Sequence, residues 1–440
     1  MKILDACTRP GSGRIKVRRA AADTDGVPDI HHVIDSRAIT PVFQPLVSLT
    51  TGDLVGYEAL SRGPAGTPWE SPATLFAAAR TAGRDSELDW VCRAAAYRAA
   101  LAADLRTALF VNMEPTSWRT PCPPDLAGVV AEAQRRLHVV TEMTERVLAD
   151  DPSALLAATT SCRAAGWGVA LDDVGADPMS LALMPFVHPD VVKLDMSLLH
   201  SPTERHTAEV VAAVAAYAEA SGATILAEGV ETPEHELTAR TMGATVAQGW
   251  YYGRPAPLPA APPARTAPLP PVCAPAAASG TPYEIVAAHR PVVETTKSVL
   301  MPISHHIEAL ADGGQVLLAC FQDARHFGPA TARRFARIAA GSPLVAAFGT
   351  GLAAEPAPGV RGAGLDAADP LRGEWNVIVV GPHRSVALVA RDLGDTGPEA
   401  DRRFSFAVTH NRDLVVAAAR SLLQAITPVR AAALEGLVAA

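Results

Sequence analysis

The 440-residue sequence has few cysteines, no long hydrophobic run and no excess of positive charge. Its six cysteines are scattered and form no CxxC pair, which argues against a structural zinc site and indicates reduced thiols. No run of about 18 or more uncharged apolar residues occurs, so we expect neither a signal peptide nor a membrane span, and therefore a cytoplasmic protein. The formal net charge of −8 provides no global field that would attract nucleic acid or an anionic membrane.

The composition is suited to burial, because 49% of the residues are hydrophobic and only 19% are charged. At this length, two or three domains are expected. Residues 1–28 combine basic side chains with Gly, Thr and Asp and predict a flexible basic tail; a basic arm that contacts nucleic acid or a partner is the alternative. Residues 257–282 are rich in Pro and Ala, which predicts a semi-rigid linker between two domains.

Residues 29–256 repeat one pattern, in which short apolar runs rich in β-branched residues alternate with helical stretches. Such runs are typical of parallel strands that are buried on both faces. Eight runs fit a (β/α)8 barrel of the TIM type, and they begin near positions 41, 54, 108, 137, 168, 190, 223 and 245. The turn at 48–53, with Gly52 and Asp53, predicts a hairpin, so the first strand of this α/β fold should be reversed.

Residues 283–427 show a different pattern, with a helical stretch at 294–311, several strand-like runs and a closing helix from 411 to 426. The GPHR turn at 381–384 lies between two of these runs and predicts a hairpin. We therefore expect a smaller α+β domain built on an antiparallel sheet, a design common among sensor modules. Residues 428–440 are expected to form a C-terminal tail.

The chemically informative residues of the first region are polar side chains in or at the end of otherwise apolar runs. An unpaired carboxylate in such a place is costly to bury, so a cation is expected beside it. In a barrel, the strand ends converge on the face where active sites are built. The residues in question are Glu58, Asn112, Glu142, Asp172, Asp173, Lys193, Glu228 and Gln248.

Among these side chains, five carboxylates, the amide oxygen of Asn112 and a single ammonium form a donor set that suits Mg²⁺ or Mn²⁺ rather than zinc. Two such ions about 3.5–4 Å apart could share Asp172 and activate a water for attack at phosphorus. Any one of these acids, taken singly, could instead cap the following helix. Capping does not explain so many strand ends at once, so the pattern favours phosphodiester hydrolysis.

The most specific signal is a series of seven short segments, which are GYEALSR (56–62), VNMEP (111–115), EMTE (142–145), LDDVG (171–175), VVKLD (191–195), AEGVE (227–231) and QGWYYGRP (248–255). In order and spacing they resemble the motifs of the EAL-domain phosphodiesterases. The resemblance covers about 36–256 and implies a barrel with a reversed first strand. It also implies hydrolysis of cyclic diguanylate (cyclic di-GMP) to the linear dinucleotide pGpG with Mg²⁺ or Mn²⁺, by a chain that is expected to form a homodimer.

Carried over residue by residue, the resemblance assigns two metal sites. The first is expected to be held by Glu58, Asn112, Glu142 and Asp172, and the second by Asp172, Asp173 and Glu228. Catalytic roles are implied for Glu228, which is the general base in a one-metal alternative, for Lys193, which would orient the attacking water, and for Asp173. Substrate contacts are implied for Gln44, Leu60, Arg62 and Gln248, and support of the metal-site loop for Glu145 and Glu231.

The chain departs from the family pattern just after the acid pair. Val174 stands where the family commonly has Phe, and Asp177-Pro178 replaces the final glycine. The loop thereby loses a large packing surface, and in the family this loop links metal binding to the dimer interface. An active phosphodiesterase is the leading hypothesis, because every metal ligand is kept. The alternative is a catalytically weak or inactive receptor that binds cyclic di-GMP and signals through the second domain.

The second region resembles a DICT sensory domain, through SHHIEAL (304–310), ACFQDARHF (319–327), WNVIVV (375–380) and FSFAVTHNRDLV (404–415). The resemblance implies that this domain regulates the barrel in response to a signal or partner that the sequence does not specify. His305, His306 and His326 are candidate metal ligands, but exposed histidines on helices are the commoner explanation, since no further ligand spacing accompanies them.

Overall fold

The computed structural model describes residues 28–114, 117, 120–144, 152–176, 180–182, 184–260, 267, 269, 279–311 and 313–426. The tails predicted at 1–28 and 428–440 lie outside these residues, apart from Pro28, and so does most of the predicted linker. Within the linker, the backbone N–H of Ala267 donates a hydrogen bond to the carbonyl of Leu54 (2.8 Å) at the start of a barrel strand.

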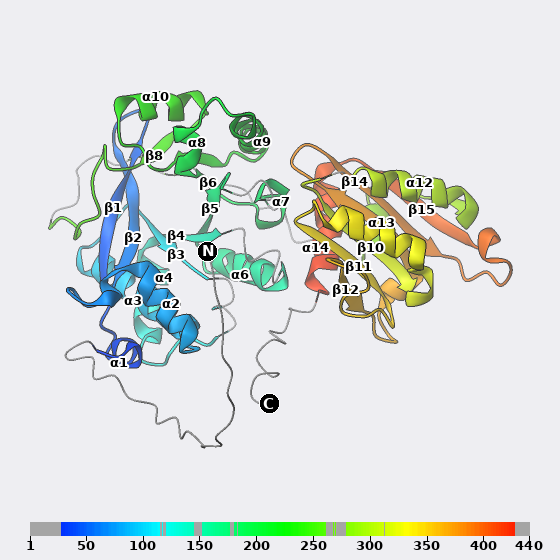
Figure 1. The fold of residues 1–440 in the computed structure, drawn as a ribbon, viewed down its shortest axis with the longest axis horizontal. Helices are drawn as coiled ribbons and strands as arrows, with labels where there is room; N and C mark the ends of the chain where they lie inside the picture. The colour runs from blue at the N-terminus through cyan, green and yellow to red at the C-terminus, as the bar shows by residue number, and fades with distance from the viewer. Residues whose placement is uncertain are drawn as a thin grey trace, which may run out of the picture.

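The N-terminal region is a closed eight-stranded barrel whose strands alternate with helices (Figure 1). In sequence order around the barrel, the strands are β1 (Thr40–Ser48), β2 (Leu54–Arg62), β3 (Ala108–Asn112), β4 (His138–Thr144), β5 (Gly168–Val174), β6 (Val191–Leu194), β7 (Thr224–Ala227) and β8 (Val246–Gln248). Strand β1 pairs antiparallel with both β2 and β8, whereas the other neighbours pair in parallel. The predicted barrel and its reversed first strand are confirmed.

Helices cover the outside of the barrel because alternate strand residues point outward and are apolar. On β3, Leu109 and Val111 belong to the core between strands and helices, while Phe110 points into the barrel interior. The covering helices are α1 (Ile30–Asp35), α2 (Pro72–Thr81), α3 (Asp85–Ala102), α4 (Ala127–Arg136), α6 (Pro152–Ala164), α7 (Met184–Val187), α8 (Met196–His200), α9 (Arg205–Ser221) and α10 (Pro233–Thr241).

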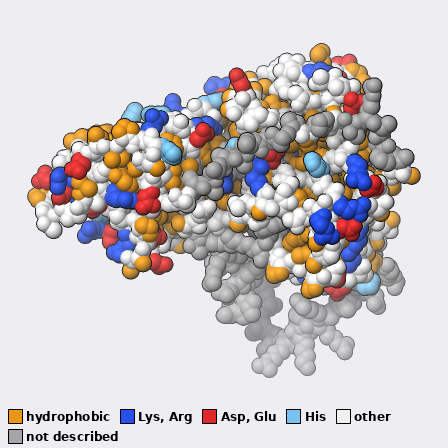
Figure 2. Space-filling view, turned by 180° about the vertical axis from the view of Figure 1, so that it is seen from behind, with side chains coloured by type: hydrophobic (Ala, Val, Ile, Leu, Met, Phe, Trp, Pro, Cys, Tyr) orange, Lys and Arg blue, Asp and Glu red, His pale blue; other side chains and the backbone are white. Residues whose placement is uncertain are grey.

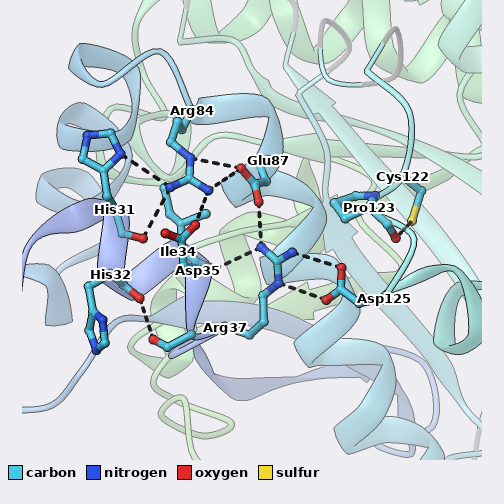
Figure 3. A network of polar contacts seen from close by, with 11 residues as sticks. His31, His32, Ile34, Asp35, Arg37, Arg84, Glu87, Cys122, Pro123 and Asp125 are labelled. Carbon is cyan, nitrogen blue, oxygen red and sulfur yellow. Dashed lines mark hydrogen bonds and ion pairs between the residues drawn. The ribbon is translucent and has the colours of Figure 1, made fainter.

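An ion-pair network fixes α1 and the segment after it against α3 (Figure 3). Arg37, whose φ of 56° is left-handed, pairs with Glu87 (2.8 Å) and with Asp125 (3.1 Å). Arg84 pairs with Asp35 (2.6 Å) and with Glu87 (2.5 Å). The network joins segments that lie up to 88 residues apart in sequence. It thereby fixes the segment that precedes β1 to the outside of the barrel.

The C-terminal domain is a seven-stranded sheet with helices on both faces, in the order β12-β11-β10-β13-β14-β15-β9. Its elements are α11 (Pro282–Ala287), β9 (Val293–Thr296), α12 (Lys297–Ala309), β10 (Val316–Asp323), α13 (Pro329–Ala339), β11 (Leu344–Thr350), β12 (Arg361–Gly364), β13 (Glu374–Val380), β14 (Ser385–Asp392), β15 (Arg403–Thr409) and α14 (Arg412–Gln424). The predicted α+β class is confirmed.

The expectation of an antiparallel sheet is wrong for one half of this domain. Strand β10 pairs in parallel with β11, and β11 pairs in parallel with β12. Parallel neighbours need a long crossover connection, because the chain must return to the starting edge of the sheet before the next strand begins. Helix α13 provides this connection between β10 and β11. The remaining neighbours, from β10 through β13, β14 and β15 to β9, are antiparallel.

The two faces of this sheet pack against different partners. One face holds a core with α12 and α13, to which Leu300, Ile307 and Phe335 contribute. The other face packs on α11 and α14, and α14 also contacts α6 and α7 of the barrel. Figure 1 shows α14 between the sheet and these two barrel helices. At this contact, Arg420 Nη1 donates a hydrogen bond to the carbonyl oxygen of Phe186 (2.8 Å).

Seen from behind, positive and negative side chains lie next to one another over both parts of the molecule (Figure 2). Within the part of the chain that the structure describes, no helix is both long and apolar enough to cross a bilayer.

Candidate active site

An apolar layer fills the barrel interior, and a polar layer follows it at the carboxyl ends of the strands. The apolar layer is buried and includes Phe110, Val140, Ala170, Val191, Leu226 and Val246. Strand side chains alternate between faces, so the residue two positions further along each strand also points inward. On β3, β4, β5, β6 and β8 these positions are Asn112, Glu142, Asp172, Lys193 and Gln248, and Glu228 takes the same position directly after β7. Strand periodicity therefore brings the predicted side chains together in one layer, next to the apolar layer of the barrel interior.

Lys193 lies at the centre of this polar layer with its side chain only 1% exposed. Its Nζ is 2.7 Å from Glu142 Oε1, 2.7 Å from Asp172 Oδ1 and 2.8 Å from Glu228 Oε1. Glu58 Oε1 lies further away, at 3.9 Å. A buried ammonium is thus surrounded by four carboxylates, and negative charge exceeds positive charge in this cluster.

The pKa values of the cluster reflect this imbalance. Burial lowers the pKa of Lys193, but the surrounding carboxylates outweigh burial and raise that pKa well above its usual value, so the ammonium stays protonated. Burial, followed by repulsion from Glu58, raises the pKa of Glu142 well above the ordinary range. Burial raises the pKa of Glu228 to about 8, although Lys193 opposes the shift. Without a further cation, part of this cluster holds protons at neutral pH.

The donor atoms fit a divalent cation. One carboxylate oxygen each from Asp172, Asp173 and Glu228 lie within 4.8 Å of one another. Among the described residues, the buried Oε2 atom of Glu142 has no hydrogen-bond partner. An all-oxygen set with an unpartnered buried acceptor and excess negative charge is suited to a hard ion such as Mg²⁺ or Mn²⁺.

A local irregularity of β5 brings two consecutive aspartates to one site. The pairing register between β5 and β6 shifts between Leu171 and Val174, as in a β-bulge. Asp173 has a left-handed backbone with φ of 54°, a conformation that costs free energy in a non-glycine residue and clusters at functional sites. Val174, where the family commonly has Phe, is fully buried in the core around the barrel.

Amide side chains orient Glu58. Gln248 Nε2 donates hydrogen bonds to Glu58 Oε2 and to Gln44 Oε1, the latter at 3.1 Å. Asn112 Nδ2 donates to Glu58 Oε1 at 3.2 Å, and Gln44 Nε2 donates to the carbonyl of Gly253 at 3.1 Å. Gln44 and Gln248 are both buried. This network fixes one edge of the cluster to the reversed strand β1 and its neighbours.

A cavity of about 290 Å³ opens beside Asn112 and Glu142, between the first strands and α2 and α3. Leu60 lines it, as do Phe76 and a buried ion pair between Asp89 and Arg93 (2.7 Å). Sequence reasoning missed this pair. The available signal was an acid and a base four positions apart in a mostly apolar helix.

Two predicted residues, Arg62 and Glu231, stand apart from the cluster. Arg62 ends β2, and its Nη1 donates a hydrogen bond to the carbonyl of Ser61 (2.8 Å). Glu231 is exposed on the loop after β7, where its backbone N–H donates to His235 Nδ1 (3.4 Å). Glu145 lies outside the described residues, and so do Asp177 and Pro178.

Two protein-family models match the chain. A model described as "EAL domain" matches residues 29–255. A model described as "Sensory domain in DIguanylate Cyclases and Two-component system", the DICT domain, matches residues 285–393. The two matches fall on the barrel and on the sheet-rich domain.

Curated relatives match the barrel region. The probable cyclic di-GMP phosphodiesterase PdeB of Escherichia coli is 28% identical over 234 residues, which is 51% of this chain and 45% of that protein. The cyclic di-GMP phosphodiesterase RocR of Pseudomonas aeruginosa is 27% identical over 256 residues, which is 54% of this chain and 62% of that protein. The chain spans less than half the length of the first curated relatives that it matches. A solved manganese/cyclic di-GMP complex of Klebsiella pneumoniae BlrP1 is 28% identical, with a TM-score of 0.44, and the match covers 50% of this chain and 56% of that one.

Replacement of Lys193 by Met should destabilise the metal-free chain by about 3–5 kcal/mol, because it leaves the buried carboxylates without the ammonium among them. The loss should be larger at pH 8 than at pH 5, since the carboxylates can take up protons at the lower pH. Denaturant unfolding measures both values. Arg106→Met, which removes a surface ion pair, serves as control and should change stability little. Equal losses in the two variants would contradict the role of Lys193.

The raised pKa of Glu228 predicts a pH dependence of stability. The native chain binds this proton more tightly than the unfolded chain does, so its contribution is complete below the ordinary pKa of 4.5 and is lost as pH rises toward about 8. The slope from one such group is at most about 1.4 kcal/mol per pH unit. In chelator, Glu228→Gln should flatten the fall in unfolding free energy over this range. The exposed control Glu219→Gln should keep the wild-type slope, and a wild-type slope in Glu228→Gln would exclude the assignment.

Proposed function

Because the EAL model matches more than half of the chain, the chain belongs to the EAL domain family, and we propose that it hydrolyses cyclic di-GMP to linear pGpG with Mg²⁺ or Mn²⁺. The observation that carries the proposal is the buried carboxylate cluster around Lys193, which keeps every metal-ligand identity of the family. Buried acids in this number must be neutralised, and bound divalent cations would neutralise them while leaving the carboxylates ionised. Two relatives that match this region are named as cyclic di-GMP phosphodiesterases.

We assign the metal ligands as the resemblance implies. Glu58, Asn112, Glu142 and Asp172 would hold one ion, and Asp172, Asp173 and Glu228 the other. Bound divalent ions would lower the pKa of a coordinated water and offset charge on the phosphate.

The chain's own residues supply the remaining chemistry. In the one-metal alternative, in which Glu228 is not a metal ligand, its carboxylate would accept a proton from the attacking water. In either scheme a P–O bond to that water would form and the P–O bond to the ribose oxygen would break, with a proton from solvent on the leaving oxygen. Lys193 remains an ammonium, because its raised pKa keeps it charged, and it stabilises the negative charge that builds on the phosphate. Asp173 holds its carboxylate beside Asp172 through its left-handed backbone.

Substrate contacts are proposed on both sides of the cluster. Arg62 Nη1 donates a hydrogen bond to the carbonyl of Ser61. The guanidinium geometry of Arg62 suits bidentate binding of two phosphate oxygens. Leu60 lines the cavity of about 290 Å³, which offers an apolar surface to a nucleobase. Gln44 and Gln248 form the buried floor beneath the substrate. Glu231 and Glu145 are proposed to support the loops around the metal site.

We further propose that residues 29–256 form the catalytic barrel, 257–282 the linker and 283–427 the sensory domain, and that the chain acts as a homodimer. Regulation would pass through the contact between α14 and the barrel. Helix α7 follows the Asp172–Asp173 pair along the chain, and α14 is bonded to it through Arg420. A docked α14 would hold α7 in place against β5, the strand that presents Asp173.

Glu58→Gln is the first test of the proposed activity. It removes the carboxylate charge but keeps the shape, so metal-dependent formation of pGpG should fall at least about 100-fold with little change in fold. Turnover is measured by separating the guanine nucleotides after incubation with Mg²⁺ or Mn²⁺, and with chelator as blank. Glu132→Gln on the exposed face of α4 is the matched control. Full activity of Glu58→Gln would refute the proposed site. Wild-type protein that binds cyclic di-GMP with metal but leaves it intact would favour the receptor alternative.

Arg420→Met tests the regulatory contact. The variant loses the hydrogen bond to Phe186, so we expect turnover to fall severalfold while the heat-denaturation midpoint of the chain stays close to that of wild type. Arg333→Met on the exposed face of α13, away from the barrel, is the control and should retain full turnover. Wild-type turnover in Arg420→Met would show that this contact does not support the strand that presents Asp173.

A further inference from the structure

The C-terminal domain contains a second cavity, of about 110 Å³, between α12 and the sheet. It lies on the face that packs α12 and α13, opposite the face that carries α14 and contacts the barrel. It is separate from the carboxylate cluster, because its lining comes entirely from residues 297–404.

Helix α12 turns an unusual face toward this cavity. Lys297, Met301, Ser304, His305 and Glu308 line it, at spacings that place them on one side of a helix. The buried residues of an amphipathic helix are normally apolar. In α12, however, Ser304 and Glu308 are each only 2% exposed. Burying a carboxylate here costs stability that an apolar residue would not cost, so packing alone does not favour these polar residues.

Aromatic side chains form the opposite wall. Phe321 on β10, Trp375 on β13 and Phe404 on β15 line the cavity. The rings of Trp375 and Phe404 are 5.6 Å apart in an edge-to-face arrangement. Phe321 is held in the same way against Phe335, at 5.5 Å. These contacts fix the wall in a shape that suits one flat ring.

The charged groups of the lining favour an acidic ligand. Glu308 is already neutralised, since Oε2 accepts from Arg334 Nε (2.5 Å) and Oε1 accepts from Ser304 Oγ (3.3 Å). Among the described residues, the terminal nitrogens of Arg334 have no partner, whereas Lys297, the other cation of the lining, is already paired through Nζ with Glu399 Oε1. Both cations are therefore paired with a carboxylate, and the donors left for a ligand oxygen are the two terminal nitrogens of Arg334.

We infer that this cavity binds a small single-ring aromatic acid, with its ring against Phe321, Trp375 and Phe404 and its carboxylate or phenolate oxygen at Arg334. The size limits the ligand to a single ring, because this cavity of about 110 Å³ is smaller than the roughly 150 Å³ cavity that accommodates benzene. A cyclic dinucleotide is too large for this space. The site would therefore sense a molecule other than the substrate or product proposed for the barrel.

Binding of benzoate and 4-hydroxybenzoate to the full chain, measured by titration calorimetry without cyclic di-GMP, tests the inference. We expect one site, and affinity for either acid about tenfold or more above that for the neutral benzamide or the cationic benzylamine. Because no hydrolysis is measured, a failure here is distinct from a failure of the proposed phosphodiesterase. Absence of measurable binding of both acids, or tighter binding of benzylamine, would overturn the inference.

Two variants locate the site. Ser304→Leu fills the cavity and should abolish binding, whereas Ala309→Leu, on the exposed side of the same helix, should not. The double variant Glu308→Gln/Arg334→Gln keeps a hydrogen-bonding pair but removes both charges, and should weaken acid binding at least about tenfold. The exposed pair Arg333→Gln/Arg337→Gln is its control. Unchanged acid binding in both Ser304→Leu and the double variant would place the site elsewhere.

Discussion

The burial of four carboxylates around the single ammonium of Lys193 is the constraint on which the barrel site depends, because their negative charge must be neutralised. Three of these carboxylates approach Lys193 Nζ within 2.8 Å, yet the acids outnumber the cation and the pKa of Glu228 is raised to about 8. Such a cluster is expensive for folding, since each ion must be taken out of water. Its excess negative charge is the property that divalent ions neutralise. The closed barrel therefore holds a buried site with excess negative charge, which suits divalent ions and phosphoryl chemistry.

The sequence predicts the barrel and its polar layer because both follow from the alternation of strand side chains. The apolar runs locate eight strands, and the turn at 48–53 predicts that the first is reversed. The polar residues in or at the ends of these runs locate the polar layer. The bulge that turns Asp173 to the same site depends on pairing between β5 and β6, which no local pattern reveals. Likewise, the parallel pairing of β10 with β11 depends on where α13 crosses the sheet, and the burial of Asp89 with Arg93 depends on the packing of α3 against the first strands.

The C-terminal sheet lies between the surface that contacts the barrel and the cavity under α12. Helix α14 packs against one face of β13 and β14 and contacts the barrel, while α12 packs against the other face of the same strands and closes the cavity at Trp375. Interiors are densely packed and deform little, so a change on one face is felt on the other. In this arrangement, the cavity and the barrel are connected through a few packed elements: α12, two strands, α14 and α7.

We propose that the carboxylates around Lys193 form a divalent-metal site. Crystals of the full chain soaked in Mn²⁺ with cyclic di-GMP, with anomalous scattering recorded at the manganese edge, test it most directly. We expect two anomalous peaks, one among Glu58, Asn112, Glu142 and Asp172 and one among Asp172, Asp173 and Glu228. Anomalous density absent from the cluster at saturating Mn²⁺, with Lys193 still as the sole cation contacting the acids, would contradict the account.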